Sequence, residues 1–364
     1  MYLIDIATAN PPYKVSQSKV GDELKKIIPG NAAARMIDAA SVHSGIDSRY
    51  FAIADAVDMP SKKFYTKDSS FIKPGTDSRM NEYEIWSKQL SKQSVENLLK
   101  DNRINPSKIN RIVTISCTGF FAPGLDHFLI NTFHFPLSAK RTNIGFMGCA
   151  ASIVGFGAVL DSMKSASEND SLTLLLSLEL CSLHVQTEPT RDNILANMLF
   201  ADGCAAVLFS PSPITESKAK LNLISTDSFL FPETEKFMKW KIGSFGFELV
   251  LSSELPKTIL ESAIPQLNKI LNARGIKIDS IKHWALHPGG RAILDALQNG
   301  LCLSDEMMEP SRNVLKNFGN MSSASILFVL KELLNTRKIN KDDLCCAVAF
   351  GPGLTMEVAL FSGI

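Results

Sequence analysis

The feature that most constrains this chain is an internal repeat of a short segment. The run Asn143-Ile-Gly-Phe-Met-Gly-Cys149-Ala-Ala-Ser-Ile is echoed by Asn317-Phe-Gly-Asn-Met-Ser-Ser-Ala324-Ser-Ile. Asn, Gly, Met and Ala recur at matching places, 174 positions apart (143 to 317), and Cys149 corresponds to Ser323. A chain that repeats itself at about half its length predicts a duplicated fold. The thiol, present in one copy only, predicts a single nucleophile.

The segments around the two copies repeat as well. Each copy is preceded by a helical pattern and an apolar run of strand length, and is followed by a second such run. These elements are expected at 82–100, 111–117 and 171–177 in the first half, and at 256–271, 281–286 and 344–350 in the second. The closing strands, 207–210 and 359–362, are only 152 positions apart. The first half therefore holds about twenty extra residues between Cys181 and Phe200, and long insertions in α/β folds tend to be site loops.

Length and composition fit two similar globular halves, which we divide at 1–212 and 213–364. The chain has 364 residues, of which 45% are hydrophobic and 21% charged, enough to build a core. A net charge of +1 gives no reason to expect nucleic acid or an anionic membrane as a partner. No apolar run reaches the roughly 18–20 residues of a bilayer span. The first residues predict a strand and not a signal peptide, so we expect a cytoplasmic protein.

The seven cysteines do not suggest disulfides or a metal site. Their number is odd, and no CxxC pair or zinc-ligand spacing is present. Free thiols in a reducing cytosol are the expected state for most of them. Cys345 and Cys346 are adjacent in an expected strand and should point to opposite faces.

Cys149 stands directly before a small, apolar run over 150–160, which is typical of a buried helix. A cysteine at the N-terminus of a helix experiences the positive end of the helix dipole, and this favours the nucleophilic thiolate. The alternative is an inert core cysteine, and the local sequence alone favours that alternative.

Two distant residues could complete a nucleophile arrangement with Cys149. His287 follows an expected strand, and a turn formed by Pro288, Gly289 and Gly290 can aim its imidazole outward. Asn320 lies at the start of the helix in the second copy, near Cys149 if the halves are related by a two-fold axis. A cysteine with a distant His and Asn is a known nucleophile arrangement. The plainer alternatives are a hydrogen-bonded turn histidine and an N-cap asparagine.

Four runs spread over nearly the whole chain match one family in order. They are Ala7-Thr-Ala-Asn-Pro-Pro12, Trp284-Ala-Leu-His-Pro-Gly-Gly-Arg-Ala-Ile-Leu-Asp295, Phe318-Gly-Asn-Met-Ser-Ser-Ala324 and Phe350-Gly-Pro-Gly-Leu-Thr-Met-Glu357. Together they resemble chalcone synthase and its relatives, the type III polyketide synthases. Three further runs resemble the microbial branch that makes alkylresorcinols and alkylpyrones more than the plant enzymes. They are Ser116-Cys-Thr-Gly-Phe120, Pro123-Gly-Leu-Asp126 and Glu179-Leu-Cys-Ser-Leu-His184.

The resemblance implies an α/β thiolase fold, with two duplicated halves in a five-layered αβαβα architecture, and a homodimer. It implies an acyltransferase that loads an acyl starter on Cys149, extends it with malonyl-CoA by decarboxylative condensation, and cyclises the product to an alkylpyrone or alkylresorcinol. His287 would pair with the thiolate and, with Asn320, hold the thioester oxygen of malonyl-CoA while CO2 leaves. CoA thioesters are the substrates, and no metal or redox cofactor is implied.

Two other functions stay open from the sequence. One is a single-step condensing enzyme like ketoacyl synthase III, and the other is a thiolase-fold partner subunit with little activity. The intact set Cys149, His287 and Asn320 argues against the second, because a degenerate subunit would be free to lose one of them.

The resemblance also places a pocket and a CoA site. Residues expected at the substrate pocket are Cys117, Glu179, Cys181, His184, Trp240, Leu249 and Ser322. Residues expected at the CoA site or its supporting loops are Arg35, Gly289, Gly290, Gly351, Pro352 and Gly353.

The family's basic cluster falls at 33–43, where Arg35 is the main cation, so delivery of the starter by an acyl carrier protein stays open. Small or unbranched lining residues predict a medium- or long-chain fatty acyl starter, while the bulk of Trp240 argues against one.

Overall fold

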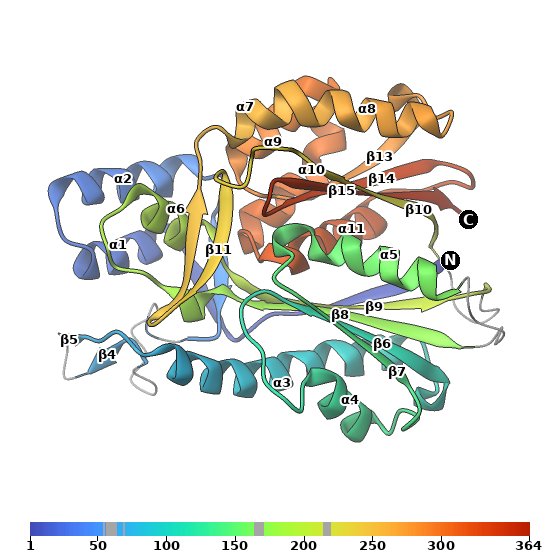
Figure 1. Ribbon diagram of the computed structural model, residues 1–364, viewed down its shortest axis with the longest axis horizontal. Coiled ribbons are helices and arrows are strands. Elements are labelled where there is room, and N and C mark those ends of the chain that lie inside the picture. The colour runs from blue at the N-terminus through green and yellow to red at the C-terminus, as the bar shows by residue number, and fades with distance from the viewer. Residues whose placement is uncertain (54, 56–63, 68–69, 164–170, 214–219) are drawn as a thin grey trace.

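The computed structural model describes residues 1–53, 55, 64–67, 70–163, 171–213 and 220–364. Its elements form five layers, in the order helix, sheet, helix, sheet, helix (Figure 1). No helix in these residues is long and apolar enough to span a bilayer. The five-layered α/β architecture expected from the sequence is therefore confirmed.

The two halves share one strand order. In the first half the strands are β1 (Tyr2–Ala9), β6 (Ile109–Ser116), β7 (Lys140–Gly145), β8 (Leu172–Leu180) and β9 (Asp202–Ser210), arranged β7-β6-β8-β9-β1. In the second they are β10 (Leu221–Leu230), β13 (Ile281–Leu286), β14 (Leu344–Gly351) and β15 (Thr355–Gly363), arranged β13-β14-β15-β10. The pair β6–β8 is parallel like β13–β14, and β8–β9 is antiparallel like β14–β15. The sequence repeat thus corresponds to a repeated strand order and strand direction in the two halves.

Among the described residues, the two sheets join along β1 and β10, through the register pairs Tyr2↔Asn222 and Leu3↔Leu221. Within the described residues, the second half has no strand in the place of β7. We propose the boundary between the halves at 212 and 213, in the connection from β9 to β10.

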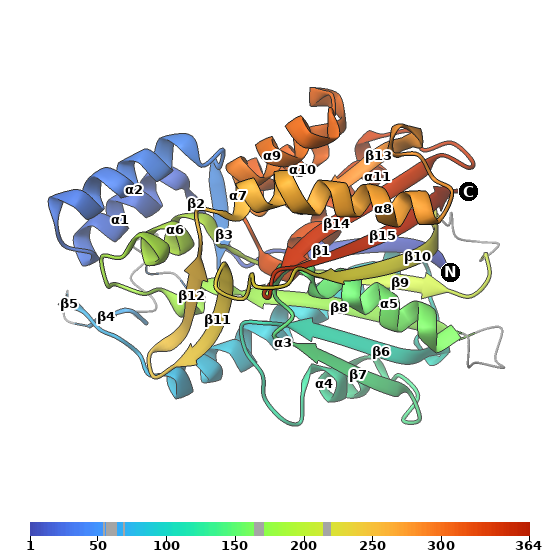
Figure 2. The same ribbon diagram turned by 45° about the horizontal axis from the view of Figure 1, so that its top comes forward.

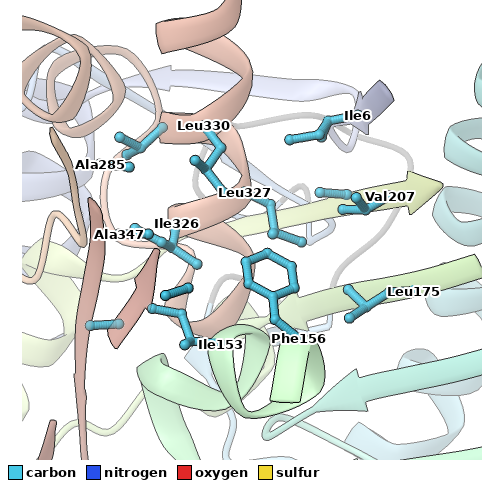
Figure 3. Close-up of a cluster of buried hydrophobic side chains, with 14 of the residues drawn as sticks. Ile6, Ile153, Phe156, Leu175, Val207, Ala285, Ile326, Leu327, Leu330 and Ala347 are labelled. Carbon is cyan, nitrogen blue, oxygen red and sulfur yellow. The ribbon is translucent and has the colours of Figure 1, made fainter. Parts of the chain in front are cut away.

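The middle layer consists of α5 (Ala151–Met163) and α11 (Ser325–Thr336), the two helices that follow the repeated segment. Figure 3 shows Ile153 and Phe156 of α5 and Ile326, Leu327 and Leu330 of α11 packed between the sheets. Each such side chain, fully buried, contributes about 1.5–3 kcal/mol. Both sheets press on this layer, which explains why residues 151–160 of α5 and 325–330 of α11 are all small or apolar.

The outer layers are amphipathic helices. On the first sheet lie α3 (Thr76–Asp101) and α4 (Leu125–Phe133), and on the second lie α8 (Ile264–Ala273), α9 (Arg291–Leu301) and α10 (Asp305–Phe318). The short α7 (Leu255–Thr258) and a π-helical turn, η5 (Ile259–Ala263), lead into α8. Ser304 caps α10, its side chain accepting a hydrogen bond from the backbone of Met307.

A group of elements outside the layers gathers at one end of the molecule (Figure 2). The helices are α1 (Gln17–Ile27), α2 (Asn31–His43) and α6 (Arg191–Leu199), and β2 (Tyr13–Ser16) pairs with β3 (Ser48–Phe51). The hairpin of β11 (Met238–Gly243) and β12 (Gly246–Leu251) stands beside them, and the two-residue strands β4 (Thr66–Lys67) and β5 (Ser70–Phe71) lie near α3. The extra segment of the first half supplies the turn η4 (Cys181–His184) and α6.

Two local expectations are resolved here. Cys345 belongs to the central core and Cys346 to the core under the outer helices, so the two thiols do point to opposite faces. The polar composition of the stretch 62–81 predicts a surface loop, but the chain is helical from Thr76 onward, where α3 begins. Residues 62, 63, 68 and 69 of that stretch lie outside the described residues.

Candidate active site

Cys149 sits in a tight turn between β7 and α5. Gly148 has a φ of +63°, and the 3₁₀ turn η3 (Gly148–Ala150) leads directly into the helix. A Cβ on Gly148 would lie 2.2 Å from Cδ of Pro352, and one on Gly351 would lie 2.7 Å from the Met147 carbonyl oxygen. The loop of Gly351, Pro352 and Gly353 therefore packs directly under the nucleophile turn, and glycine is required at both points of contact.

Asn320 is fixed from three sides at the corresponding turn of the second half, η7 (Ser322–Ala324). Its backbone N–H donates to the Leu199 carbonyl at 3.0 Å, and its own carbonyl accepts from the Ala201 N–H at 2.9 Å. Its side-chain oxygen accepts from the Ser322 N–H at 2.8 Å. The residue before α11 is Ala324, so the alternative of Asn320 as the N-cap of that helix does not hold.

His287 lies directly after β13, where its backbone N–H donates to the Val348 carbonyl at 2.9 Å and its carbonyl accepts from Gly289 at 2.8 Å. The side chain is only 3% exposed, yet neither ring nitrogen has a hydrogen-bond partner. Buried polar atoms are normally satisfied. Two unpartnered nitrogens on one imidazole are what a site awaiting a substrate would present.

The three residues line one cavity of about 430 Å³. Of the other residues singled out in the sequence, those that line it are Cys117, Cys181, Trp240, Leu249, Ser322, Gly289, Gly290 and Pro352. Those that do not are Glu179, His184, Gly351, Gly353 and Arg35. Arg35 is exposed on α2, and the two glycines belong to the supporting loop.

Burial sets the charge state of the nucleophile. Desolvation raises the pKa of the Cys149 thiol to about 12, although hydrogen bonds with Ser322 and Asn320 act in the opposite direction. Desolvation likewise lowers the pKa of His287 to about 3. This desolvation acts against the thiolate that the position of Cys149 at the start of a helix would favour. Burial therefore favours the neutral thiol of Cys149 and the neutral imidazole of His287.

Glu179 connects the two halves behind the cavity wall. It is fully buried at the end of β8, and its carboxylate accepts from the Cys117 N–H at 2.9 Å and the Thr118 hydroxyl at 2.8 Å. The Ser323 hydroxyl donates to its other oxygen. Burial raises the pKa of Glu179. These contacts orient the turns that carry Cys117 and Ser323, and they leave no face of the carboxylate toward the substrate space.

His184 and Trp240 build a wall between two cavities. The Phe247 N–H donates to Nδ1 of His184 at 3.0 Å, so Nε2 carries the proton and donates to the Thr118 carbonyl at 2.7 Å. Burial lowers the pKa of His184 to about 3, and the neutral ring stacks on Phe247 with centroids 4.2 Å apart. The Trp240 indole N–H donates to the Cys117 carbonyl at 2.6 Å. Both side chains are satisfied structural groups.

A second cavity of about 130 Å³ adjoins the first. Apolar side chains such as Val20 and Leu24 of α1 make up most of its lining surface, and His184 stands in its wall. The polar residues that line it include Glu23, Asp55, Asn193 and Asn197. The residues that line both cavities are Cys181, Phe200, Trp240 and Leu249.

Several cavity residues were missed from the sequence: Phe200, His43, Arg191 and Arg291. Arg291 follows the His-Pro-Gly-Gly run directly and Phe200 ends the extra segment, so proximity to these features was the available signal.

Within the described residues, no group of three or more His, Cys, Asp or Glu is placed to hold a metal ion.

Comparison with known protein families gives two matches. The model described as "Chalcone and stilbene synthases, C-terminal domain" matches residues 222–364, and "FAE1/Type III polyketide synthase-like protein" matches residues 61–227.

Relatives and solved structures agree with these matches. The chain is 28% identical to "Alpha-pyrone synthesis polyketide synthase-like Pks18" of Mycobacterium tuberculosis over 361 residues, 98% of this chain and 89% of the relative. It is 30% identical to "Putative chalcone synthase" of Bacillus subtilis, over 70% of this chain and 71% of the relative. The crystal structure of PKS-I from the brown alga Ectocarpus siliculosus superposes with a TM-score of 0.92 at 29% identity, covering 100% of this chain and 98% of that one. The 1,3,6,8-tetrahydroxynaphthalene synthase of Streptomyces coelicolor, at 24% identity and a TM-score of 0.86 over 100% and 99% of the two chains, shares the fold.

Proposed function

Because this chain belongs to the type III polyketide synthases, the chalcone synthase-like family of decarboxylating acyltransferases, we propose that Cys149, His287 and Asn320 are its catalytic centre. One observation carries the proposal. A single cavity holds the Cys149 thiol, the Asn320 side chain and a buried imidazole with both nitrogens unpartnered. The enzyme loads an acyl starter on Cys149, extends it with malonyl-CoA and cyclises the product to an alkylpyrone or alkylresorcinol.

Loading begins from the neutral pair. Sγ of Cys149 attacks the thioester carbonyl while the imidazole of His287 accepts the thiol proton, so no free thiolate has to form in the buried site. The negative charge moves to the thioester oxygen, and CoA then leaves as its thiol with the proton held on His287. The resting pKa values of about 12 and 3 oppose a preformed ion pair, and they support a transfer that accompanies bond formation.

Condensation uses His287 and Asn320 together to stabilise a second negative charge. Malonyl-CoA loses CO2, and the electron pair of the broken C–C bond forms an enolate whose oxygen is held by N–H groups of His287 and Asn320. The enolate carbon attacks the acyl carbonyl on Cys149, the C–S bond breaks, and Sγ leaves as a thiolate that takes a proton from water. The side-chain oxygen of Asn320 is already engaged by Ser322, which supports an orientation in which the amide N–H groups face the substrate.

We further propose that the starter is a medium- or long-chain fatty acyl group. The second cavity supports this, because it adjoins the catalytic one at Cys181 and Leu249 and is lined by apolar residues such as Val20 and Leu24. Each buried CH2 contributes about 0.8 kcal/mol. Trp240 stands between the two spaces, so an acyl chain would have to pass beside its indole.

A homodimer is supported by an exposed apolar patch beside the nucleophile turn. Phe120 is 55% exposed, and its ring centroid lies 6.1 Å from that of Phe146. The next residue, Met147, is 38% exposed. Aromatic surface of this kind usually marks an interface. Sedimentation should give twice the 39.9 kDa of the chain at micromolar concentration. A 40 kDa species would reject the dimer.

We place the enzyme in the cytoplasm, where the free thiols described here stay reduced.

The function is tested with purified protein, [14C]malonyl-CoA and acetyl-, hexanoyl-, lauroyl-, palmitoyl- and coumaroyl-CoA, with products identified by mass. Products of two or more extensions, with the highest kcat/KM for lauroyl- or palmitoyl-CoA, are expected. Trp240→Ala should raise kcat/KM for the long chains. Products of one condensation only would favour the single-step condensing enzyme, and a preference for acetyl- or coumaroyl-CoA would overturn the starter proposal. If the enzyme turned over only acyl carrier protein thioesters, the starter would be delivered by a carrier protein and not by CoA.

A further inference from the structure

The permanent charges on the wall of the catalytic cavity have one sign. Among the described residues that line it, the charged side chains are Arg191 and Arg291, with no Asp or Glu. The two arginines are the first residues of α6 and α9, and their side chains are 48% and 54% exposed, so they stand at the mouth. His43, at the end of α2, is also exposed there.

Neither guanidinium is saturated by the protein. Nη1 of Arg191 donates to the Leu251 carbonyl at 3.1 Å and lies 3.4 Å from Asp192. Nε of Arg291 lies 3.6 Å from Asp295, which Arg312 binds more closely at 2.8 Å. By contrast, Arg274 on the far side of the second half holds Asp227 with two bonds of 2.7 and 2.9 Å. The mouth arginines therefore keep several N–H donors free for a ligand.

Arg35 is poorly placed for the same task. It is exposed on α2, five residues before Ala40, where that helix begins to line the cavity. This spacing puts Arg35 about 7.5 Å along the helix from the lining and about 140° around its axis. Arg291, in contrast, contacts the end of α2, since a Cβ on Gly45 would lie 3.7 Å from its Cβ. The cationic groups that face the cavity thus come from α6 and α9.

We infer that Arg191 and Arg291 bind the phosphate groups at the end of the pantetheine arm of the thioester substrate, an inference that rests on the proposed function. Guanidinium groups bind phosphate oxygens through paired, charge-assisted hydrogen bonds. With the reacting thioester at Cys149, the arm extends through the mostly apolar cavity, and its phosphates emerge between α6 and α9. CoA and the phosphopantetheine of a carrier protein share this chemistry.

The test compares Arg191→Gln and Arg291→Gln with Arg103→Gln, an exposed arginine after α3, as the matched control. Kinetics are measured with CoA thioesters and with N-acetylcysteamine thioesters, which lack phosphate. Each mouth variant should raise KM for CoA thioesters about five- to tenfold at low salt with kcat nearly unchanged, and should leave the N-acetylcysteamine values unaltered. Added salt should raise the wild-type KM for CoA substrates and erase part of the difference.

The pattern of losses across the thioesters and variants decides the inference. Equal losses with both thioester types, or no loss with either, would overturn it, as would a loss caused by Arg35→Gln and not by the mouth variants. The same loss with a 4′-phosphopantetheine thioester would assign the arginines to the phosphate that carrier proteins also present, and a loss confined to CoA would assign them to CoA alone. Wild-type turnover of N-acetylcysteamine thioesters tests the proposed function separately. If it fails, calorimetric titration with CoA itself still tests the arginines.

Discussion

In the turn that leads into α5, Cys149 follows Gly148 with its φ of +63°; in the turn that leads into α11, Ser323 follows Ser322, whose φ is +46°. The two turns have the same left-handed backbone at the same place in the repeat. The side chains of Cys149 and Ser323, which follow these two positions, have different surroundings. Cys149 lines the cavity, whereas the fully buried Ser323 donates to Glu179 and lies 2.9 Å from the Ser177 hydroxyl. The duplication supplies one geometry twice, and the local contacts decide which copy reacts.

The supports of the two turns differ in a matching way. Glu179, near the end of β8, holds the second turn through Ser323. At the corresponding end of β14, Gly351 has no side chain, so the loop that contains it approaches Met147 and packs Pro352 against Gly148. A side chain at Gly351 would displace the nucleophile turn. One turn is therefore held by polar bonds and is inert, and the other is held by close packing and leaves its thiol free.

The largest effect is expected from moving the thiol between the turns. Cys149→Ala should reduce polyketide formation by about 10³-fold or more. Adding Ser323→Cys should restore nothing, because that thiol would face Glu179 and not the cavity. Product formation is followed by mass spectrometry, and retained malonyl-CoA decarboxylation serves as the control for folding. Recovery of activity in the double variant would mean that the two turns are chemically interchangeable.

A smaller effect is expected from the residue that the second turn contributes to the first. Asn320→Ala should lower malonyl-CoA decarboxylation by roughly 10²-fold, as loss of an oxyanion donor does. Acyl loading onto Cys149 should survive better, because it needs only the thiol and His287. Release of CO2 and retention of labelled acyl groups are measured on the same preparation. An equal fall in both would make Asn320 a structural residue whose side chain holds the turn at Ser322.

The ionisation of the Cys149 thiol should make its reactivity change gradually with pH. Because burial raises the pKa of Cys149 to about 12 while that of His287 is about 3, the thiolate fraction should rise about tenfold per pH unit across the neutral range. The rate of inactivation by iodoacetamide, measured from pH 6 to 9, should follow this slope without a bend. A plateau above pH 7 would instead reveal a thiolate–imidazolium pair in the resting enzyme.

The smallest effect concerns stability. Glu179→Gln places an amide NH2 among groups that donate to the carboxylate, and should lower the free energy of unfolding by about 1–3 kcal/mol. A double-mutant cycle with Ser323→Ala should show coupling, since the two side chains are bonded. Denaturant unfolding is the measurement, and Glu248→Gln, on the exposed side of β12, is the control. Additive changes would show that Glu179 does not hold the second turn.

Much of the fold could be predicted, because the repeat fixes the topology and the strand 281–286 has the predicted bounds. The juxtaposition of Cys149 with Asn320 also follows from the repeat. The effect of burial on the pKa of Cys149 could not be predicted from the sequence. The helix dipole is a local property, whereas desolvation depends on how the whole chain packs.

The sequence also could not predict that Glu179 and His184 lie behind the wall of the catalytic cavity and do not line it. Every residue of β8 is buried, so its sequence shows no alternation to indicate which face is which. The arginines at the mouth come from elements that meet only through tertiary packing.

The difference between the two turns is tested most directly by trapping the acyl-enzyme. The protein is incubated with [14C]lauroyl-CoA without malonyl-CoA, digested, and its labelled peptide identified by mass spectrometry. The acyl group should be found on the peptide that contains Cys149, on no peptide with Cys117 or Cys181, and nowhere in Cys149→Ala. A label on either of those neighbouring cysteines, or one that persists in Cys149→Ala, would contradict the assignment of the nucleophile.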